Sequence, residues 1–460
     1  MTNVDAASMT SVGLLPLIGR TPLVELTKFD TGPCRLFVKL ESQNPGGSIK
    51  DRIGLAMIEA AERSGAVAPG ATLVEATAGN TGLALALVAA RKGYHLVLVI
   101  PDKMSQEKVF HLRALGADVR MTRSDVAKGH PDYYQDLAER IARECGGYYI
   151  NQFGNAANPA AHESTTGPEI FAQMEGKLDA VVCGVGSGGT ITGLSRYFAR
   201  VAPEVEMVLA DPAGSVLAEY VRTGQLGPAG SWLVEGIGED FLPSITDLSR
   251  VKRAYTIPDE ESFTTARALL RQEGILAGSS SGTLIAAALR HCRESPTPKR
   301  VVTFVCDSGS KYLSKMFNDF WMRDQGFLAG PPQGDLRDVM GRSLDKGAVV
   351  AVAPTDTLLV AHGRMKMSDV SQVPVLEGDH IVGLLDESDL LLAATRDPAA
   401  FRRPVRDFMS TRLTTVPVGT SIEALMPTFD QGMVAIVVDG QRFLGLVTRI
   451  DVLNFLRRKL

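Results

Sequence analysis

Glycine-rich turns that follow short apolar runs constrain the fold of this chain most. Between residues 21 and 327, runs rich in β-branched residues alternate with longer stretches whose apolar residues recur at helical spacing. Such alternation is typical of an α/β fold in which a mostly parallel sheet is wrapped by helices. The expected strands span residues 71–75, 96–100, 180–184, 205–210 and 301–306. The expected helices span residues 82–92, 105–115, 136–145 and 190–201.

The first informative turn precedes Lys50. Residues 39–52 read KLESQNPGGSIKDR, and the glycines let the backbone approach a ligand closely. Lys50 follows at the start of an expected helix, where the positive end of the helix dipole disfavours a second positive charge. An amine at such a place loses its proton more easily, which suits a lysine that forms a Schiff base with an aldehyde cofactor. For this turn alone, a surface lysine beside a turn is the alternative.

Other turns are suited to anions or to polar ligand atoms. Residues 75–82 (EATAGNTG) and 184–193 (GVGSGGTITG) each follow an expected strand and open a helix. Consecutive N–H groups at a helix start form a nest for a carboxylate or a phosphate. Residues 152–159, 165–169 and 273–282 are also rich in small polar residues, although each of these segments could serve only as a turn or a helix cap.

The second of these turns also fits a dinucleotide-binding fingerprint. A G-x-G-x-x-G spacing opens a helix, and an acidic residue follows about 20 residues later. The residues concerned are Gly184, Gly186, Gly189 and Asp211. An NAD-dependent oxidoreductase is therefore an alternative from another class. The mid-chain position of the turn weighs against it, as do the additional Gly188 and Thr190, which suit a phosphate monoester.

A Gly- and Pro-rich break separates two parts of the chain. Residues 326–334 read GFLAGPPQG, a composition that marks a loop. Beyond this break, residues 356–390 and 421–453 repeat one plan of helix, strand, strand and helix, and the two copies would bury each other's sheet faces. The expected boundaries are 1–325 for a catalytic domain, 326–334 for a linker, and 335–397 and 398–460 for the two repeats.

The composition indicates a globular protein with small-molecule partners. A net charge of −4 over 460 residues gives no nucleic-acid footprint. No apolar run is long enough to span a bilayer, and residues 1–11 lack the features of a secretory signal. Five scattered cysteines favour a reducing compartment, and neither a metal-ligand spacing nor a Ser-His-Asp arrangement is visible. We therefore expect a soluble cytoplasmic protein that binds no nucleic acid, membrane or metal.

The motifs, in their order and spacing, resemble those of pyridoxal-phosphate enzymes of the tryptophan-synthase-β-like fold, the family of cysteine synthase and cystathionine β-synthase. The resemblance covers residues 17–327, and the remaining part is similar to a tandem pair of CBS domains, a Bateman module. The matching stretches are PGGSIKDR, EATAGNTG, MSQEK, QFGNAANPAAH, TTGPEI, GVGSGGTITG and EGILAGSSSG. The resemblance implies a fold-type II pyridoxal-phosphate enzyme with two open α/β subdomains, followed by the CBS pair.

The resemblance implies a role for each matching residue. Lys50 would be the Schiff-base lysine and would also take and return the α-proton of the substrate. Asn80 would bind the ring hydroxyl of pyridoxal phosphate, and Ser280 its pyridine nitrogen. The phosphate would be bound by Gly186, Ser187, Gly188, Gly189 and Thr190. The substrate would be bound by Thr77, Ala78, Asn80, Thr81, Gln152, Gly236 and Gly238.

The implied reaction is a β-replacement that condenses L-serine with L-homocysteine to L-cystathionine through an aminoacrylate intermediate, a step of transsulfuration and cysteine biosynthesis. Residues 234–243 (VEGIGEDFLP) and 311–322 (KYLSKMFNDFWM) resemble stretches of cystathionine β-synthases and favour these substrates. An O-acetylserine-dependent cysteine synthase is the alternative within the same fold, and a ligand-sensing protein with an inactive catalytic domain is another. Ala78 and Phe153 each lack a hydroxyl that many relatives carry near the substrate, which leaves the donor and the use of sulfide open.

The two repeats imply at most one regulatory site. Thr448 and Asp451 match the ribose- and phosphate-binding positions of a nucleoside-binding motif, whereas Asp386 stands at the equivalent threonine position, where its charge would repel a phosphate. S-adenosylmethionine or an adenine nucleotide is the expected ligand, and a purely structural, dimerising module is the alternative. No haem-binding domain is expected, because no Cys or His precedes Cys34. The family leads us to expect a homodimer or a higher homo-oligomer.

Overall fold

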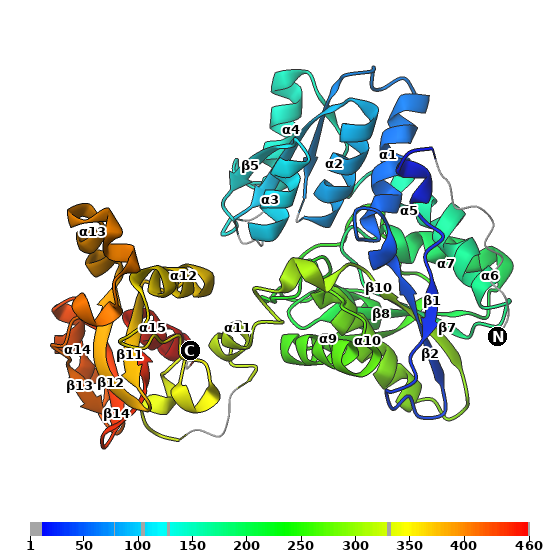
Figure 1. Ribbon diagram of the computed structural model, residues 1–460. Coiled ribbons are helices and arrows are strands. Elements are labelled where there is room, and N and C mark those ends of the chain that lie inside the picture. Colours follow the sequence, from blue (N-terminus) through cyan, green and yellow to red (C-terminus); the bar gives the residue numbers. More distant parts are fainter. Residues whose placement is uncertain (1–11, 78, 103–105, 127–128, 329–332, 459–460) are drawn as a thin grey trace. The chain divides into compact units, whose positions relative to one another are not determined.

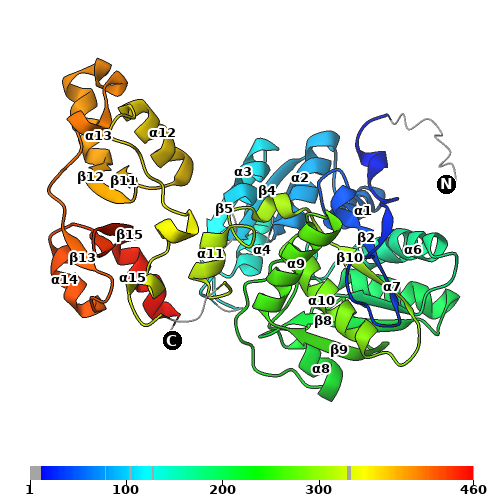
Figure 2. The ribbon, with the colours of Figure 1, turned by 60° about the horizontal axis from the view of Figure 1, so that its bottom comes forward.

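The chain divides into two compact units between Phe317 and Asn318. The computed structural model describes residues 12–458 except residues 78, 103–105, 127–128 and 329–332 (Figures 1 and 2). Among the helices of this described part, none has both the length and the apolar character needed to cross a bilayer.

The first unit contains two sheets. The larger has six strands in the order β1-β2-β10-β7-β8-β9, and every neighbouring pair except β1 and β2 is parallel. The smaller has four parallel strands in the order β5-β4-β3-β6. The larger sheet consists of β1 (Leu23–Glu25), β2 (Arg35–Leu40), β10 (Arg300–Val305), β7 (Ala180–Cys183), β8 (Glu206–Pro212) and β9 (Val251–Ile257). The smaller sheet consists of β5 (Asp118–Thr122), β4 (His95–Pro101), β3 (Thr72–Ala76) and β6 (Tyr148–Tyr149).

Helices cover the smaller sheet on both faces, because both faces of its strands are apolar. The helices of the first unit are α1 (Lys50–Arg63), α2 (Asn80–Lys92), α3 (Gln106–Ala114), α4 (Tyr134–Cys145), α5 (Ala157–Ala161), α6 (Gly167–Gln173), α7 (Gly189–Val201), α8 (Leu217–Thr223), α9 (Asp259–Glu273) and α10 (Ser279–Arg293). Leu73 and Leu98 share a core with α1 and α2. Val74 and Val99, which point the opposite way along the pleat, share a core with α4.

The larger sheet packs against α10, which also lies beside α9. Every residue of α10 except Arg290 and Arg293 is buried. A helix that is apolar almost all round is typical of a protein core. The first turn of this core helix carries Ser280, so the fold holds the Ser280 hydroxyl in the interior.

The α/β fold expected from the sequence is confirmed. The expected strands correspond to β3, β4, β7, β8 and β10, and the expected helices to α2, α3, α4 and α7, each within two residues at either end. Apolar spacing did not predict β1, β2, β5, β6 or β9. Of these, β1, β5, β6 and β9 lie at sheet edges and are short or partly exposed, so they carry little apolar alternation, whereas β2 is largely buried and has no such explanation.

The second unit contains the two predicted repeats of helix, strand, strand and helix. Each strand pair is antiparallel with a register shift at an equivalent position, after Val375 in the first repeat and after Val437 in the second. Each repeat has its own apolar core. The elements are α11 (Asp319–Asp324), α12 (Leu358–Ser368), β11 (Gln372–Glu377), β12 (His380–Asp386), α13 (Glu387–Arg396), β13 (Thr415–Pro417), α14 (Ile422–Asp430), β14 (Ala435–Asp439), β15 (Arg442–Val447) and α15 (Arg449–Arg457).

Candidate active site

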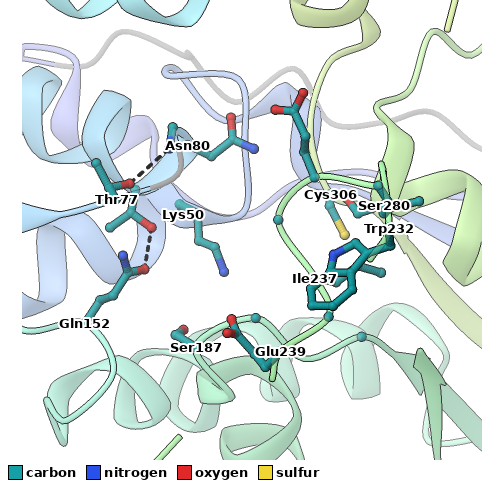
Figure 3. A pocket seen from close by; sticks show the side chains of 18 of the residues that line it. Lys50, Thr77, Asn80, Gln152, Ser187, Trp232, Ile237, Glu239, Ser280 and Cys306 are labelled. Atoms are coloured by element: carbon teal, nitrogen blue, oxygen red, sulfur yellow. Dashed lines mark hydrogen bonds between the residues drawn. The ribbon is translucent and has the colours of Figure 1, made fainter. Parts of the chain in front are cut away.

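A cavity of about 350 Å³ in the first unit collects the turns that the sequence singled out (Figure 3). Turns that are far apart in the chain meet here because the carboxyl ends of parallel strands lie at one edge of a sheet. Of the predicted site residues, those that line the cavity are Lys50, Thr77, Asn80, Thr81, Gln152, Gly186, Ser187, Gly188, Thr190, Gly236, Gly238 and Ser280. Gly189 follows directly as the first residue of α7. Ala78 lies outside the described residues, and Thr448 and Asp451 lie in the second unit.

Lys50 is the first residue of α1 and points into the cavity (Figure 3). The turn before it is joined to the end of β10, because the Ile49 N–H donates to the Cys306 carbonyl at 2.8 Å. Burial lowers the pKa of Lys50, and the acidic groups of Cys306, Glu239 and Asp307 oppose this shift only in part. Burial, rather than the helix start, is therefore the main reason that this amine gives up its proton more readily than a surface lysine does.

The turn after β3 is organised by side-chain hydrogen bonds. The Thr77 hydroxyl accepts from the backbone N–H groups of Gly79 and Gly82, each at 3.1 Å. The Thr81 hydroxyl donates to Gln152 Oε1 at 2.7 Å, and Gln152 Nε2 donates to the last carbonyl of β3 at 3.0 Å. These bonds take up the Gly79 and Gly82 N–H groups. The N–H groups of Asn80 and Thr81, for which a helix has no internal acceptor, are suited to an anion.

Asn80 is held by two residues from near the end of the first unit in sequence. Asn80 Nδ2 donates to Asp307 Oδ2 at 2.7 Å, and Lys311 Nζ donates to Asn80 Oδ1 at 2.9 Å. The Tyr312 hydroxyl donates to the same Asp307 oxygen at 2.8 Å. The sequence singled out Lys311 and Tyr312 only as the start of the stretch 311–322, and it gave Asp307 no role. Their link to Asn80 was not predicted, because the residues lie far apart along the chain.

A second buried cluster lies in the same wall. Glu235 Oε2 accepts from Lys108 Nζ at 2.5 Å, and Glu235 Oε1 accepts from Lys315 Nζ at 2.7 Å. Burial alone would raise the pKa of the Glu235 carboxyl, but the two ammonium groups lower it below its ordinary value. Glu235 therefore stays ionised and ties α3 to the segments around residues 235 and 315.

The turn after β7 is packed so tightly at Gly188 and Gly189 that these two positions admit only glycine. A Cβ on Gly188 would overlap Thr246, and a Cβ on Gly189 would overlap Asn158. Gly188 also adopts a φ of 86°, a conformation that residues other than glycine rarely adopt. The turn ends at the first residue of α7, whose N–H groups form an anion site of the kind that binds phosphate.

Ser280 and Cys306 lie together on one side of the cavity (Figure 3). Burial raises the pKa of the Cys306 thiol to about 12, although Lys50 and the Ser280 hydroxyl lower it in part. The thiol is therefore neutral at physiological pH. The sequence did not single out Cys306, because a lone cysteine at the end of a strand carries no motif.

The acidic residue of the dinucleotide alternative serves the fold instead. Asp211 is buried at the end of β8, and its Oδ2 accepts from the N–H of Ala218 in the first turn of α8 at 2.8 Å. A carboxylate in this position stabilises the start of α8. Asp211 is also absent from the lining of the described cavity.

Comparison with known proteins decides the family. Residues 14–307 match the family described as pyridoxal-phosphate dependent enzyme, and residues 336–396 and 405–458 each match the CBS domain. A cystathionine beta-synthase of Dictyostelium discoideum is 35% identical over 97% of this chain and 92% of its own length. The chain belongs to the cystathionine beta-synthase family.

Other relatives place the first unit among enzymes with related activities. Cysteine synthase A of Escherichia coli is 44% identical over 65% of this chain and 92% of its own length. The crystal structure of an O-acetylserine dependent cystathionine beta-synthase from Helicobacter pylori has a TM-score of 0.62 and 36% identity, covering 67% of this chain and 98% of that one.

The residues of the cavity fit the cofactor of the cystathionine beta-synthase family. The chain is a pyridoxal-phosphate dependent enzyme, and the cavity offers the chemistry that such a cofactor requires. An amine with a lowered pKa lies beside a glycine turn in which a Cβ on Gly186 would come within 2.5 Å of the Gly236 carbonyl. The amide of Asn80 and the hydroxyl of Ser280 supply neutral hydrogen-bonding groups in the same wall.

In the second unit, Thr448 and Asp451 cap the start of α15 and are hydrogen-bonded to each other. The Thr448 N–H and hydroxyl both donate to Asp451 Oδ2, at 2.8 and 2.5 Å. Asp386 and Asp389 form the same capping box at the start of α13. The two repeats therefore differ at this position only in the residue that begins the cap, a threonine in one and an aspartate in the other.

Proposed function

We propose that this chain condenses L-serine with L-homocysteine to L-cystathionine by β-replacement, with pyridoxal phosphate as its cofactor. The observation that carries the proposal is the amine of Lys50, whose pKa is lowered by burial and which lies between the turns after β3 and β7. Relatives named cystathionine beta-synthase support it, because they align with almost the whole chain, both units included. The bound cofactor supplies an electron sink that stabilises negative charge on the substrate α-carbon.

Four parts of the chain would hold the cofactor. Lys50 Nζ would bond to its aldehyde carbon, and the N–H groups at the start of α7 would bind its phosphate, together with the hydroxyls of Ser187 and Thr190. Asn80 would bind the ring hydroxyl, held in place by Asp307 and Lys311. Ser280 would bind the ring nitrogen. Neither Ser280 nor the neutral Cys306 thiol carries a negative charge. These two residues would therefore not stabilise a proton on the ring nitrogen.

The start of α2 would bind the carboxylate of the amino-acid donor. The N–H groups of Asn80 and Thr81 and the Thr77 hydroxyl are suited to an anion. Gln152 is positioned by the bond that it accepts from the Thr81 hydroxyl. With the donor bound, Lys50 Nζ would take the proton of the α-carbon and later return it to the same carbon. At the β-carbon the thiol sulfur would replace the hydroxyl, and the thiol proton would leave with that hydroxyl as water.

Lys50→Ala tests the proposal. The wild type should bind pyridoxal phosphate with a yellow absorption that borohydride abolishes. The variant should lack that absorption and lose at least about a thousandfold in kcat/KM. Lys28→Ala, at an exposed position, is the matched control and should behave as the wild type. A Lys50→Ala protein that turns over at the wild-type rate would refute the role of Lys50, and a wild type without turnover would favour an inactive sensor.

An O-acetylserine-dependent activity is a second candidate within the same fold. Phe153 lies in the cavity wall and packs on Phe241 with ring centroids 5.9 Å apart, so this part of the wall is apolar. Such a surface suits an acetyl leaving group better than a hydroxyl. Turnover of serine plus homocysteine, measured beside that of O-acetylserine plus sulfide, separates the two candidates.

We also propose the arrangement around this activity. The catalytic domain would span residues 1–325, the linker 326–334, and the CBS domains 335–397 and 398–460. The protein would act as a homodimer or a higher homo-oligomer. It would be located in the cytoplasm, and the five free cysteines support this location because they suit a reducing compartment. Thr448 and Asp451 would form the single site for an adenosyl ligand in the CBS pair.

A further inference from the structure

The amide group of Asn80, on the same side of the cavity as Lys50 in Figure 3, has only one orientation that its partners allow. The carboxylate of Asp307 only accepts hydrogen bonds, and it lies 2.7 Å from Asn80 Nδ2. The ammonium group of Lys311 only donates them, and it lies 2.9 Å from Asn80 Oδ1. A flipped amide would bring two donors together on one side and two acceptors on the other. Nδ2 therefore keeps one N–H group for a ligand.

The Asp307 carboxylate is itself held by few bonds. It is fully buried, and its Oδ2 accepts from Asn80 and from the Tyr312 hydroxyl, the latter at 2.8 Å. Its Oδ1 has no hydrogen-bond partner within the described part of the chain. A Cβ on Gly278 would overlap Oδ1, so this oxygen is packed against the backbone just before α10. Besides Asn80 itself, Tyr312 is the described side chain that donates to this carboxylate.

The proton of the Tyr312 hydroxyl has one direction available. Lys108 Nζ lies 3.2 Å from the hydroxyl oxygen and also lies over the Tyr312 ring, 4.7 Å from its centroid. Because an ammonium group cannot accept a hydrogen bond, the hydroxyl proton points to Asp307. Burial raises the pKa of Tyr312 well above its ordinary value, and the negative charges of Asp307 and Glu235 raise it further. The hydroxyl therefore keeps this proton at physiological pH.

These contacts form a buried chain from Lys108 through Tyr312 and Asp307 to Asn80. We propose that Tyr312 is a positioning residue, whose hydroxyl orients the Asp307 carboxylate so that Asn80 presents an N–H group to the ring oxygen of the cofactor. The inference rests on the proposed function, in which Asn80 binds that oxygen. An N–H group bonds more strongly to a deprotonated oxygen than to a hydroxyl, because the bond is then charge-assisted. The chain would therefore favour the deprotonated ring oxygen, the form that absorbs visible light.

Tyr312→Phe tests the proposal, because it removes the hydroxyl and keeps the ring. The dissociation constant for pyridoxal phosphate should rise about tenfold, as expected for the loss of a hydrogen bond to a charged group. The yellow absorption of the loaded protein should fall and a near-ultraviolet band should rise, since a less firmly held amide favours the deprotonated oxygen less. A titration followed by absorbance measures both changes.

Tyr255→Phe is the matched control. The Tyr255 hydroxyl donates to the Glu294 carboxylate at 2.7 Å and accepts from Arg253 at 3.3 Å, and Tyr255 does not line the described cavity. Each variant loses one bond between a tyrosine and a carboxylate, so urea denaturation should show a loss of stability for both. Only Tyr312→Phe should change the affinity for the cofactor and its spectrum. Equal spectral changes in the two variants would overturn the proposal.

Asn80→Ala separates positioning from a general effect on the cavity. Since Tyr312 acts through Asn80, adding Tyr312→Phe to the Asn80→Ala protein should change neither the dissociation constant nor the spectrum. A further loss in the double variant would overturn the proposal, and so would a Tyr312→Phe protein with the affinity and spectrum of the wild type. A wild type that binds no pyridoxal phosphate would overturn the proposed function and this inference together, whereas the other results overturn only the role of Tyr312.

Discussion

Two walls of the active-site cavity are built by different physical means. The turn after β3 is held by hydrogen bonds that the Thr77 hydroxyl accepts and by the bonds that join Asn80 to Asp307 and Lys311. The turn after β7 is held by close packing of glycines that leaves no space for a Cβ. A hydrogen-bonded wall depends on polar atoms and on protonation, whereas a packed wall depends on volume. The stability and cofactor affinity that depend on the hydrogen-bonded wall should therefore change with charge and pH. Those that depend on the packed wall should change when a substitution adds atoms.

Gly188→Ala is expected to have the largest effect, because it adds volume to the packed wall. The new methyl group would overlap Thr246, and alanine disfavours the φ of 86° at this position. Overpacking and backbone strain together should lower the free energy of unfolding by about 3 kcal/mol. Denaturation in urea measures this loss, and absorption spectra should show that the variant binds little cofactor.

Gly93→Ala separates strain from overlap. Gly93 also has a positive φ, 79°, but no atom lies within 4 Å of the position that a Cβ would take. This substitution should cost only about 1 kcal/mol. Replacing Thr246 by Ala in the Gly188→Ala protein should restore part of the lost stability. Equal costs at the two glycines would mean that backbone conformation, and not packing, holds this wall.

Lys311→Met should weaken the hydrogen-bonded wall to an intermediate extent. It removes the 2.9 Å bond to Asn80 and one of the positive charges near Asp307. The affinity for pyridoxal phosphate should fall about 30-fold, as expected for the loss of a hydrogen bond to a charged group. A titration followed by absorbance measures this change.

Lys92→Met is the control for Lys311→Met, since Lys92 forms a 2.7 Å ion pair with Glu62 on partly exposed surface. It should leave the cofactor affinity unchanged and alter stability by less than about 1 kcal/mol. If Lys311→Met bound the cofactor as the wild type does, Asp307 alone would be sufficient to position Asn80.

Glu75→Gln should have the smallest effect and should appear only as a change in pH dependence. Burial raises the pKa of Glu75 to about 8 from an ordinary value of 4.5, although backbone N–H groups lower it in part. The folded protein therefore binds this proton more tightly than the unfolded chain does. The resulting stability is fully present below about pH 4.5 and is lost as pH rises through about 8.

The substitution should therefore flatten the decline of the unfolding free energy across this range, by at most about 1.4 kcal/mol per pH unit. Urea denaturation at a series of pH values measures the slope. Glu144→Gln, at an exposed position, should keep the wild-type slope. If Glu75→Gln also kept that slope, the ionisation of Glu75 would not contribute to the pH dependence of stability.

Much of the first unit could be predicted because its pattern is local. Apolar spacing and glycine turns located β3, β4, β7, β8 and β10 within two residues. The same turns contain most of the predicted site residues that line the cavity. The partners of these residues could not be predicted. Asp307 and Lys311 lie 227 and 231 positions from Asn80, and no local pattern links either of them to Asn80.

The sequence by itself determined β3, β4, β7, β8 and β10, the turns that follow them and the membership of the cystathionine beta-synthase family, because each of these depends on residues close together along the chain. Only the tertiary structure decided which side chains hold Asn80 and why Gly188 must be glycine. The pKa of Lys50 is also a tertiary property. Sheet order brings distant segments together, and the burial that lowers this pKa comes from all of them rather than from the neighbours of Lys50 in sequence.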